Sequence, residues 1–174
     1  PDDAEALSLG LAGSAYQQLI TGSLAGRPPL PDLPMEAKVG CLVREAITRG
    51  LLGSAHDCSD GGLCVALAES SIASGLGIEI DLSVQGVRLD RVLFAEGGSR
   101  IVVSVKADRM GPWEALLAEQ DDLPITRIGV VTEQPCLQVR VDHHPCLNLE
   151  IEQCRDVYSS SLPRRIDGNG ELAE

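Results

Sequence analysis

The sequence predicts an α/β or α+β domain in which helices pack on a mixed β-sheet. Two patterns predict this class. Helical stripes of apolar residues alternate with short strands along most of the chain, and a predicted hairpin followed by a helix closes it. The length of 174 residues suits one domain, or one domain with part of another. A chain of this size can bury about 70% of its unfolded surface and needs no disulfide or metal to fold.

The first third is predicted to contain two helices separated by a proline-rich linker. Apolar residues with helical spacing predict helices over 14–25 and 35–49. Between them, four prolines within residues 28–34 predict an extended segment. We therefore expect a domain boundary at this linker. The expected parts are the end of a preceding domain with the linker (1–33), the main domain (34–166) and a flexible tail (167–174).

The rest of the chain is predicted to alternate between helices and strands after a polar loop at residues 54–62. The β-branched segment 101–105 is expected to be a central strand, and residues 142–145 are expected to form the turn of the hairpin. The remaining predicted strands are 78–82, 125–132, 136–141 and 146–149. The remaining predicted helices are 63–74, 89–94, 110–119 and 151–160.

The composition disfavours nucleic acid and membrane surfaces as partners. With 14 basic and 26 acidic residues, the net charge of −12 repels phosphate backbones and anionic lipids. Four aromatic residues provide no stacking platform for single strands. No apolar run approaches the roughly 20 residues of a membrane helix, and no signal peptide is visible. The six cysteines form no C-x-x-C pair, so we expect reduced thiols and a cytoplasmic location.

The densest polar cluster lies before the predicted helix at 63–74. A pair of glycines at a helix start permits close backbone approach, and the free N–H groups there can hold a phosphate or carboxylate. The alternative is that Ser59 or Asp60 simply caps the helix. The candidate ligand or phosphate-loop residues are His56, Asp57, Ser59, Asp60, Gly61 and Gly62.

A second candidate loop follows the predicted helix at 89–94. Its carboxylate, glycine pair, hydroxyl and guanidinium could clamp a polar ligand, although a glycine loop with Arg100 in a structural ion pair is the alternative. These residues are Glu96, Gly97, Gly98, Ser99 and Arg100. No P-loop or dinucleotide fingerprint is present, and no residue is assigned as catalytic or metal-binding.

Three segments carry a family resemblance. AHDCSDGGLCVALAE at 55–69 resembles the H-D-x-S-[DE]-G-G-L-x-V-A-L-A-E segment of phosphoribosylformylglycinamidine synthases. LFAEGGSRI at 93–101 is similar to their L-F-x-E-S-x-S-R-[IF], and LAGSAY at 11–16 is similar to L-G-G-S-E-Y. The similarity spans about residues 8–165. The sequence departs from the family at Gly97-Gly98, where the substrate-binding form has Ser-Gln, and at Ala15, where an acid is usual.

The resemblance implies a fold like the C-terminal domain of AIR synthase. It also implies part of an ATP-dependent C–N ligase of purine biosynthesis. That enzyme converts formylglycinamide ribonucleotide to the amidine with ATP, Mg²⁺ and glutamine-derived ammonia. The chain would be a C-terminal fragment, inactive alone and mainly architectural, that binds neither ATP nor Mg²⁺ tightly. The implied partners are the preceding ATP-handling half of the same subunit, a glutaminase subunit and a small accessory subunit.

Two other interpretations stay open at the level of the sequence. One is a domain of a related ATP-dependent enzyme, such as aminoimidazole ribonucleotide synthetase, selenophosphate synthetase or the hydrogenase-maturation factor HypE, which carries a similar glycine loop. The other is a non-catalytic interaction module that binds a partner through its helix faces and takes no small molecule.

Overall fold

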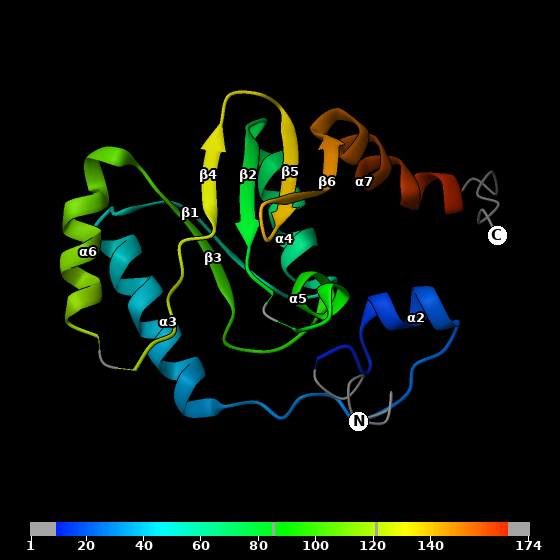
Figure 1. Ribbon diagram of the computed structural model, residues 1–174, viewed down its shortest axis with the longest axis horizontal. Coiled ribbons are helices and arrows are strands. Elements are labelled where there is room, and N and C mark those ends of the chain that lie inside the picture. The colour runs from blue at the N-terminus through cyan, green and yellow to red at the C-terminus, as the bar shows by residue number, and fades with distance from the viewer. Residues whose placement is uncertain (1–9, 85, 121, 167–174) are drawn as a thin grey trace. The chain divides into compact units, whose positions relative to one another are not determined.

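The computed structural model describes residues 10–84, 86–120 and 122–166 (Figure 1). The predicted tail at 167–174 and the first nine residues lie outside the described residues. The chain divides into two compact units, which we describe separately. Unit 1 comprises Pro1–Leu67 and Val84–Arg127, and unit 2 comprises Ala68–Ser83 and Ile128–Glu174.

Unit 1 holds most of the helices. Its elements are α2 (Ala15–Thr21), α3 (Leu33–Thr48), β1 (Leu52–Asp57), α5 (Leu89–Phe94), β3 (Ile101–Val105), the 3₁₀ turn η1 (Ala107–Arg109) and α6 (Met110–Ala118). Helix α4 (Gly62–Ser74) begins in unit 1 and ends in unit 2. Unit 2 contains β2 (Gly77–Leu82), β4 (Gly129–Thr132), β5 (Cys136–Val141), β6 (His144–Glu150) and α7 (Ile151–Ile166).

Helix α3 begins inside the segment that the sequence predicted to be extended. The Asp32 side chain caps it by accepting from the Met35 N–H at 3.0 Å, and Pro34 lies in its first turn. The proline is tolerated there because the first N–H groups of a helix have no intrahelical acceptor. The extended linker therefore ends earlier than predicted, at residue 32.

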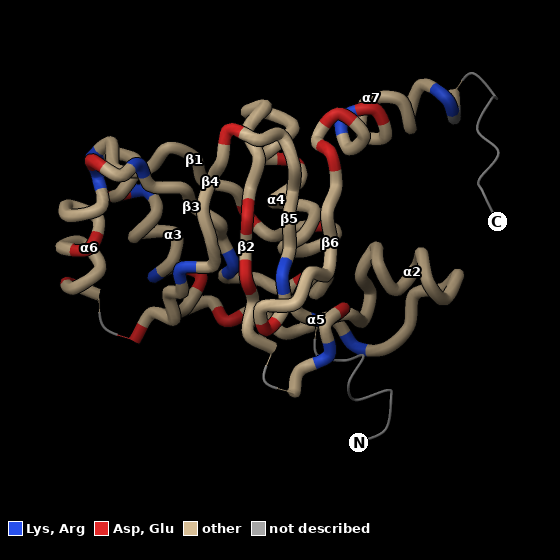
Figure 2. The backbone as a smooth tube through the Cα atoms, turned by 45° about the horizontal axis from the view of Figure 1, so that its top comes forward, with Lys and Arg blue, Asp and Glu red and all other residues tan. Residues whose placement is uncertain are grey.

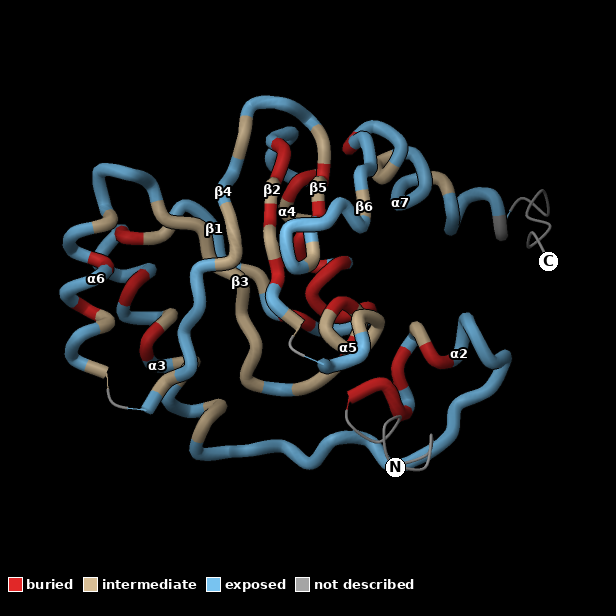
Figure 3. The backbone as a smooth tube through the Cα atoms, in the orientation of Figure 1, coloured by how far each residue is buried: buried red, intermediate tan, exposed pale blue. Residues whose placement is uncertain are grey.

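The core of unit 1 lies between α3 and α6. Leu42 and Ala46 of α3 are buried with Trp113 and Leu116 of α6, and Leu51 completes the cluster. Leu116 and Ala46 are fully buried, and Figure 3 shows buried segments on both helices. Burial of a large apolar side chain of this kind contributes about 1.5–3 kcal/mol, so this cluster contributes several kcal/mol to the stability of the unit.

Strand β1 is a correction to the sequence analysis, which predicted a polar loop at 54–62. Residues Leu52–Asp57 pair antiparallel with β3, and the Ser54 and Ser104 hydroxyls lie 2.7 Å apart across the pair. The side chains of β1 are mostly polar and exposed, so they show no strand pattern. The strand forms because it pairs with its neighbour, not because its residues have a high β-propensity. The prediction that 101–105 is a central strand is also wrong: β3 belongs to a two-stranded sheet, and its residues are half-buried.

The mixed β-sheet predicted from the sequence is confirmed in unit 2. The strand order is β4-β2-β5-β6. Strand β2 runs parallel to β5, whereas β4 is antiparallel to β2 and β6 is antiparallel to β5. The sheet core comprises Ile78, Ile80, Leu82, Leu137 and Val139. Strand β4 is shorter than predicted, because only residues 129–132 pair with β2.

The β5–β6 hairpin turns more tightly than predicted. Asp142 and His143 both have positive φ, at 47° and 67°, as the two central residues of a type I′ turn require. Strand β6 therefore starts at His144 and includes Pro145, which is tolerated because β6 is an edge strand. Helix α7 extends to Ile166, six residues beyond the predicted end.

Candidate functional site

The first predicted loop connects β1 to α4 and depends on two glycines in the left-handed region. Gly61 has a φ of +76° and Gly62 a φ of +66°. A Cβ on Gly62 would lie 2.6 Å from the Ala95 carbonyl oxygen and 2.8 Å from the Phe94 carbonyl carbon. The end of α5 therefore packs directly on the start of α4, and only glycine permits this approach.

The Glu96 carboxylate joins the two predicted loops. Its Oε1 atom accepts the Gly61 N–H at 2.7 Å and the Ala15 N–H, at the start of α2, at 2.9 Å. The Glu96 N–H in turn donates to the Gly10 carbonyl oxygen at 2.8 Å. We call this arrangement of Gly10, Ala15, Gly61, Gly62 and Glu96 the Glu96 junction. It brings three segments of unit 1 together through backbone groups and one side chain.

The junction bears directly on the predicted anion loop. The Gly61 N–H, one of the donors expected to face a phosphate, donates to a carboxylate of the same chain. The Gly62 N–H donates to the Ser59 carbonyl oxygen at 3.0 Å and closes the turn before α4. The Glu96 carboxylate therefore already occupies the position at this helix start that is favourable for an anion.

The remaining polar residues of the first loop are at the surface. The Ser59 hydroxyl donates to Asp57 Oδ2 at 2.5 Å, and this bond lowers the pKa of the Asp57 carboxyl below its usual value. The His56 Nδ1 atom lies 2.7 Å from the Asp57 carbonyl oxygen. Asp60 is exposed. Cys58 is buried, and burial raises the pKa of its thiol.

The residues of the second predicted loop lie in two different places. Glu96 belongs to the junction, whereas Arg100 lies against the end of α5. The Arg100 guanidinium donates to the Ala95 carbonyl oxygen at 3.1 Å and to the Val92 carbonyl oxygen at 3.4 Å. Both are carbonyls at the C-terminal end of a helix, where a cation is favourable. The ion pair suggested for Arg100 is thus replaced by hydrogen bonds to carbonyls.

The glycine pair and the serine of this loop lie outside the Glu96 junction. Gly98 lies against the Glu36 side chain of α3, and Ser99 adopts a positive φ of 62°. Gly97 has open space where a Cβ would be. The structure therefore brings Glu96 to Gly61 and leaves Gly97 and Arg100 on the side of α5.

The sequence analysis did not assign the start of α2 to the site. The Ala15 N–H reaches Glu96, and the neighbouring Tyr16 ring stacks on Phe94 with ring centroids 4.7 Å apart. The LAGSAY segment carried the only signal for this region, and it was used for the family resemblance alone.

Within the described ranges, no cluster of three or more His, Cys, Asp or Glu side chains could hold a metal ion. Among the same residues, no helix is both long and apolar enough to cross a membrane.

Comparison with solved structures identifies the class of fold. The structure titled "T. maritima PurL complexed with FGAR" matches 78% of this chain and 23% of its own, with a TM-score of 0.65 and 18% identity. A HypE–HypF complex matches 82% of this chain and 48% of its own, with a TM-score of 0.53 and 19% identity. At these identities the likeness concerns the fold: an α/β domain shared by PurL and HypE.

The sequence comparison is more specific. The chain belongs to the family described as AIR synthase related protein, C-terminal domain, which it matches over residues 6–142. A phosphoribosylformylglycinamidine synthase subunit PurL from Synechococcus sp. (strain CC9902) is 48% identical over 95% of this chain and 22% of its own length. The PurL of Nostoc sp. (strain PCC 7120 / SAG 25.82 / UTEX 2576) is 41% identical over 90% of this chain and 21% of its own. The chain thus spans about one fifth of the curated relatives it matches, and the predicted resemblance is confirmed.

Proposed function

We propose that this chain is the C-terminal AIR-synthase-related domain of a PurL subunit of phosphoribosylformylglycinamidine synthase. The whole enzyme is the ATP-dependent ligase of purine biosynthesis described above. The observation that carries the proposal is the identity of 48% to a PurL subunit over 95% of this chain. Solved structures of T. maritima PurL include complexes with FGAR, ATP and AMPPCP, which agrees with this substrate and cofactor.

Within that enzyme, the role of the chain is architectural. The Glu96 junction supports this role, because the glycine loop that could hold a phosphate binds a carboxylate of its own chain at 2.7 Å. A ligand would have to displace Glu96 to reach the Gly61 N–H. Within the two loops, Gly61, Gly62 and Glu96 then serve to hold the starts of α2 and α4 and the end of α5 together.

ATP and Mg²⁺ belong to the rest of the enzyme in this proposal. The first loop does not fit a phosphate-binding loop, since Glu96 uses the Gly61 N–H. We therefore assign no chemical step on ATP to residues of this chain.

The proposed partners follow from the same assignment. They are the preceding half of the PurL subunit, the glutaminase subunit and the small accessory subunit, in the cytoplasm. A structure titled "Structure of PurLQS from Thermotoga maritima" supports an assembly of this kind. We further propose that residues 1–33 end the preceding ATP-handling domain, with residues 34–166 forming the main domain. The family match crosses this boundary, so the test of it is whether residues 34–174 fold without the first 33.

A complementation experiment tests the enzyme assignment. A purine-requiring bacterium is given a Synechococcus PurL that lacks its C-terminal fifth, with this chain supplied as a separate polypeptide. We expect growth without purines and amidine formation in extracts. A Gly62→Ala chain should fail because its junction cannot form, whereas a Gly50→Ala chain should succeed. Absence of growth with a folded, expressed wild-type chain would contradict the assignment.

A binding experiment tests the architectural role separately. The purified chain is titrated with ATP and with formylglycinamide ribonucleotide, each with and without Mg²⁺, while its melting temperature is recorded. We expect no shift that depends on Asp60 and Gly61, whereas a ligand bound at this loop, at a hundredfold excess over its Kd, would stabilise the chain by about 2.7 kcal/mol. A shift that disappears in an Asp60→Ala, Gly61→Ala variant would instead make the first loop a ligand site.

A further inference from the structure

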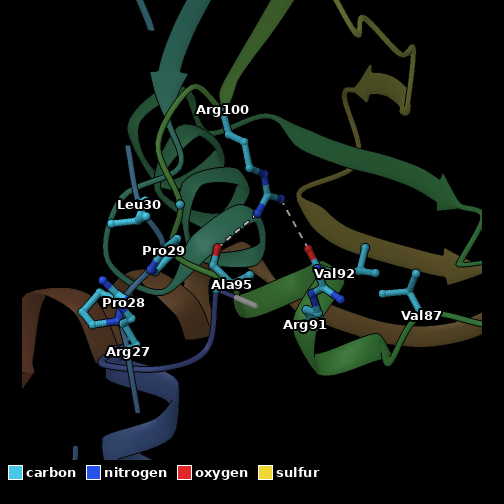
Figure 4. A pocket seen from close by; sticks show the side chains of 11 residues that line it. Arg27, Pro28, Pro29, Leu30, Val87, Arg91, Val92, Ala95 and Arg100 are labelled. Carbon is cyan, nitrogen blue, oxygen red and sulfur yellow. Dashed lines mark hydrogen bonds between the residues drawn. The ribbon is translucent and has the colours of Figure 1, made fainter. Parts of the chain in front are cut away.

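A hollow of about 680 Å³ lies between α5 and the linker that follows α2 (Figure 4). All of its lining residues belong to unit 1. Arg27 and Pro28 contribute the linker side, Arg91 and Val92 the α5 side, and Arg100 the loop beyond. We call this cavity the arginine hollow. Its volume lies in the range of about 300–1,000 Å³ that is typical of small-molecule sites.

The charge of the hollow is opposite to that of the chain. Among the described residues that line it, three are basic and none is acidic. Figure 2 shows basic positions on α5 and on the linker after α2. The acid of α5, Asp90, is paired with Arg88 at 2.6 Å, and neither residue lines the hollow. Cations that line a concave site raise the local concentration of anions, even on a protein of net negative charge.

Arg100 is held in place before any ligand arrives. Its two terminal nitrogens donate to the Ala95 and Val92 carbonyl oxygens (Figure 4). A guanidinium has five N–H donors, so these two bonds orient the group without exhausting it. A side chain that is ordered in advance loses less entropy when it binds an anion.

The walls of the hollow are apolar. Pro28 and Pro29 face Val87 and Val92, and Val87 is 42% exposed to solvent. An inorganic anion alone would leave these apolar surfaces exposed to water. A molecule with both a phosphate and an apolar or ring-shaped body would use the guanidinium groups and the walls together.

We propose that the arginine hollow binds an organic phosphate, with its phosphate on the guanidinium groups and its carbon skeleton on the proline–valine walls. The site is distinct from the Glu96 junction, because Glu96 and Gly61 do not line the hollow. It does not depend on the function proposed above. A phosphomonoester suits the planar, multidentate donors of arginine, because several of its oxygens can accept hydrogen bonds at once.

Phenyl phosphate is the probe for this proposal, with phenol and inorganic phosphate as its two halves. The chain is labelled with ¹⁵N and titrated, and the amide resonances are followed by NMR. We expect the Leu30, Val87 and Val92 amides to shift, and phenyl phosphate to bind about tenfold more tightly than either half. The affinity should fall as salt rises, since screening weakens the charge interaction.

Arg27→Gln is the informative variant, because Arg27 is an exposed linker residue, whereas loss of Arg100 would also remove two bonds to α5. We expect Arg27→Gln to weaken phenyl phosphate binding about fivefold. Arg44→Gln is the matched control, since Arg44 is an arginine of the same unit outside the hollow. It should leave the Kd unchanged.

Three outcomes would overturn the proposal. The first is no binding of phenyl phosphate at millimolar concentration. The second is an equal effect of Arg27→Gln and Arg44→Gln, or equal binding of phenol. The third is a hexaglutamate peptide that binds more tightly than phenyl phosphate with the same dependence on Arg27, which would make the hollow a contact for an acidic protein segment.

Discussion

The Glu96 carboxylate accepts the backbone N–H of Gly61 at 2.7 Å, across 35 residues of sequence. The same oxygen accepts the Ala15 N–H, so one side chain satisfies two helix-start donors that come from different parts of the chain. A carboxylate in such a position accepts hydrogen bonds from free backbone N–H groups, as a bound anion does in other glycine loops. The stability of unit 1 should therefore depend on this residue.

Glu96→Ala removes both hydrogen bonds and leaves two donors without their acceptor. We expect a loss of about 2 kcal/mol in the free energy of unfolding. Glu96→Gln keeps an Oε1 acceptor and should cost less than about 1 kcal/mol. Urea unfolding followed by the fluorescence of Trp113, the single tryptophan and part of the unit 1 core, measures both values. Equal losses in the two variants would show that the bonds to Oε1 do not carry the effect.

Gly62 and Gly50 provide a matched pair for the close approach of α4 and α5. Both have a φ of +66°, but a Cβ on Gly62 meets the Ala95 backbone, whereas a Cβ on Gly50 meets nothing within 4 Å. We expect Gly50→Ala to cost about 1 kcal/mol from the left-handed conformation alone. Gly62→Ala should cost about 3 kcal/mol or more, since the backbone must also move. Thermal unfolding of the two variants gives the comparison, and similar melting temperatures would argue against the packing described here.

The β5–β6 turn should make unit 2 sensitive to acid. The His143 N–H donates to Asp81 Oδ1 at 3.1 Å, and this backbone bond is the main cause that lowers the pKa of Asp81. A carboxyl with a lowered folded pKa stabilises the fold fully above its unfolded pKa of about 3.9. That contribution is lost as the pH falls through the folded pKa. A ¹³C NMR titration of the Asp81 carboxyl measures the shift.

His143→Gly separates the two contacts that His143 makes with Asp81. The substitution keeps the backbone N–H and removes the ring, whose Nδ1 lies 2.5 Å from Asp81 Oδ2. Because glycine also suits the φ of 67° at this position, the variant should be as stable as the wild type or more stable. The pKa of Asp81 should stay below its usual value. A return to that value would assign the shift to the imidazole.

The cysteines should differ sharply in reactivity. Cys58 is 5% exposed, and burial raises the pKa of its thiol, so little thiolate forms at neutral pH. Cys41 and Cys146 are exposed. With a disulfide reagent at pH 7.5, we expect Cys41 and Cys146 to react first and Cys58 only after unfolding in urea. Mass spectrometry of the labelled peptides identifies the order, and early labelling of Cys58 in the folded chain would contradict its placement.

The sequence predicted the elements whose signal is local. The apolar stripe of α3 and the alternating pattern of β2 were sufficient, because each depends on burial of one face. Strand β1 was missed, since its residues are mostly polar and exposed and its order comes from β3, whose pairing starts more than 40 residues later. The hairpin turn, predicted over residues 142–145, was two residues too long, because His144 and Pro145 belong to β6.

The candidate site shows the same division. Both glycine loops could be located from composition and from the family resemblance. Their contact through Glu96 could not be predicted, because nothing local in the sequence indicates which donor a carboxylate 35 residues away will meet. The arginine hollow could not be predicted from the sequence either. Arg27 and Arg91 lie far apart along the chain, and neither belongs to a local motif that indicates a binding site.

The Glu96 junction also has a consequence for the order in which the chain folds. Its two backbone donors lie 35 and 81 residues before the carboxylate, so the contact closes long loops and comes at a large entropic cost. During synthesis, the starts of α2 and α4 emerge from the ribosome well before the residue that joins them. Contacts of this kind form late in folding, after the transition state. Loss of the Glu96 contacts should therefore mainly raise the unfolding rate and change the folding rate little.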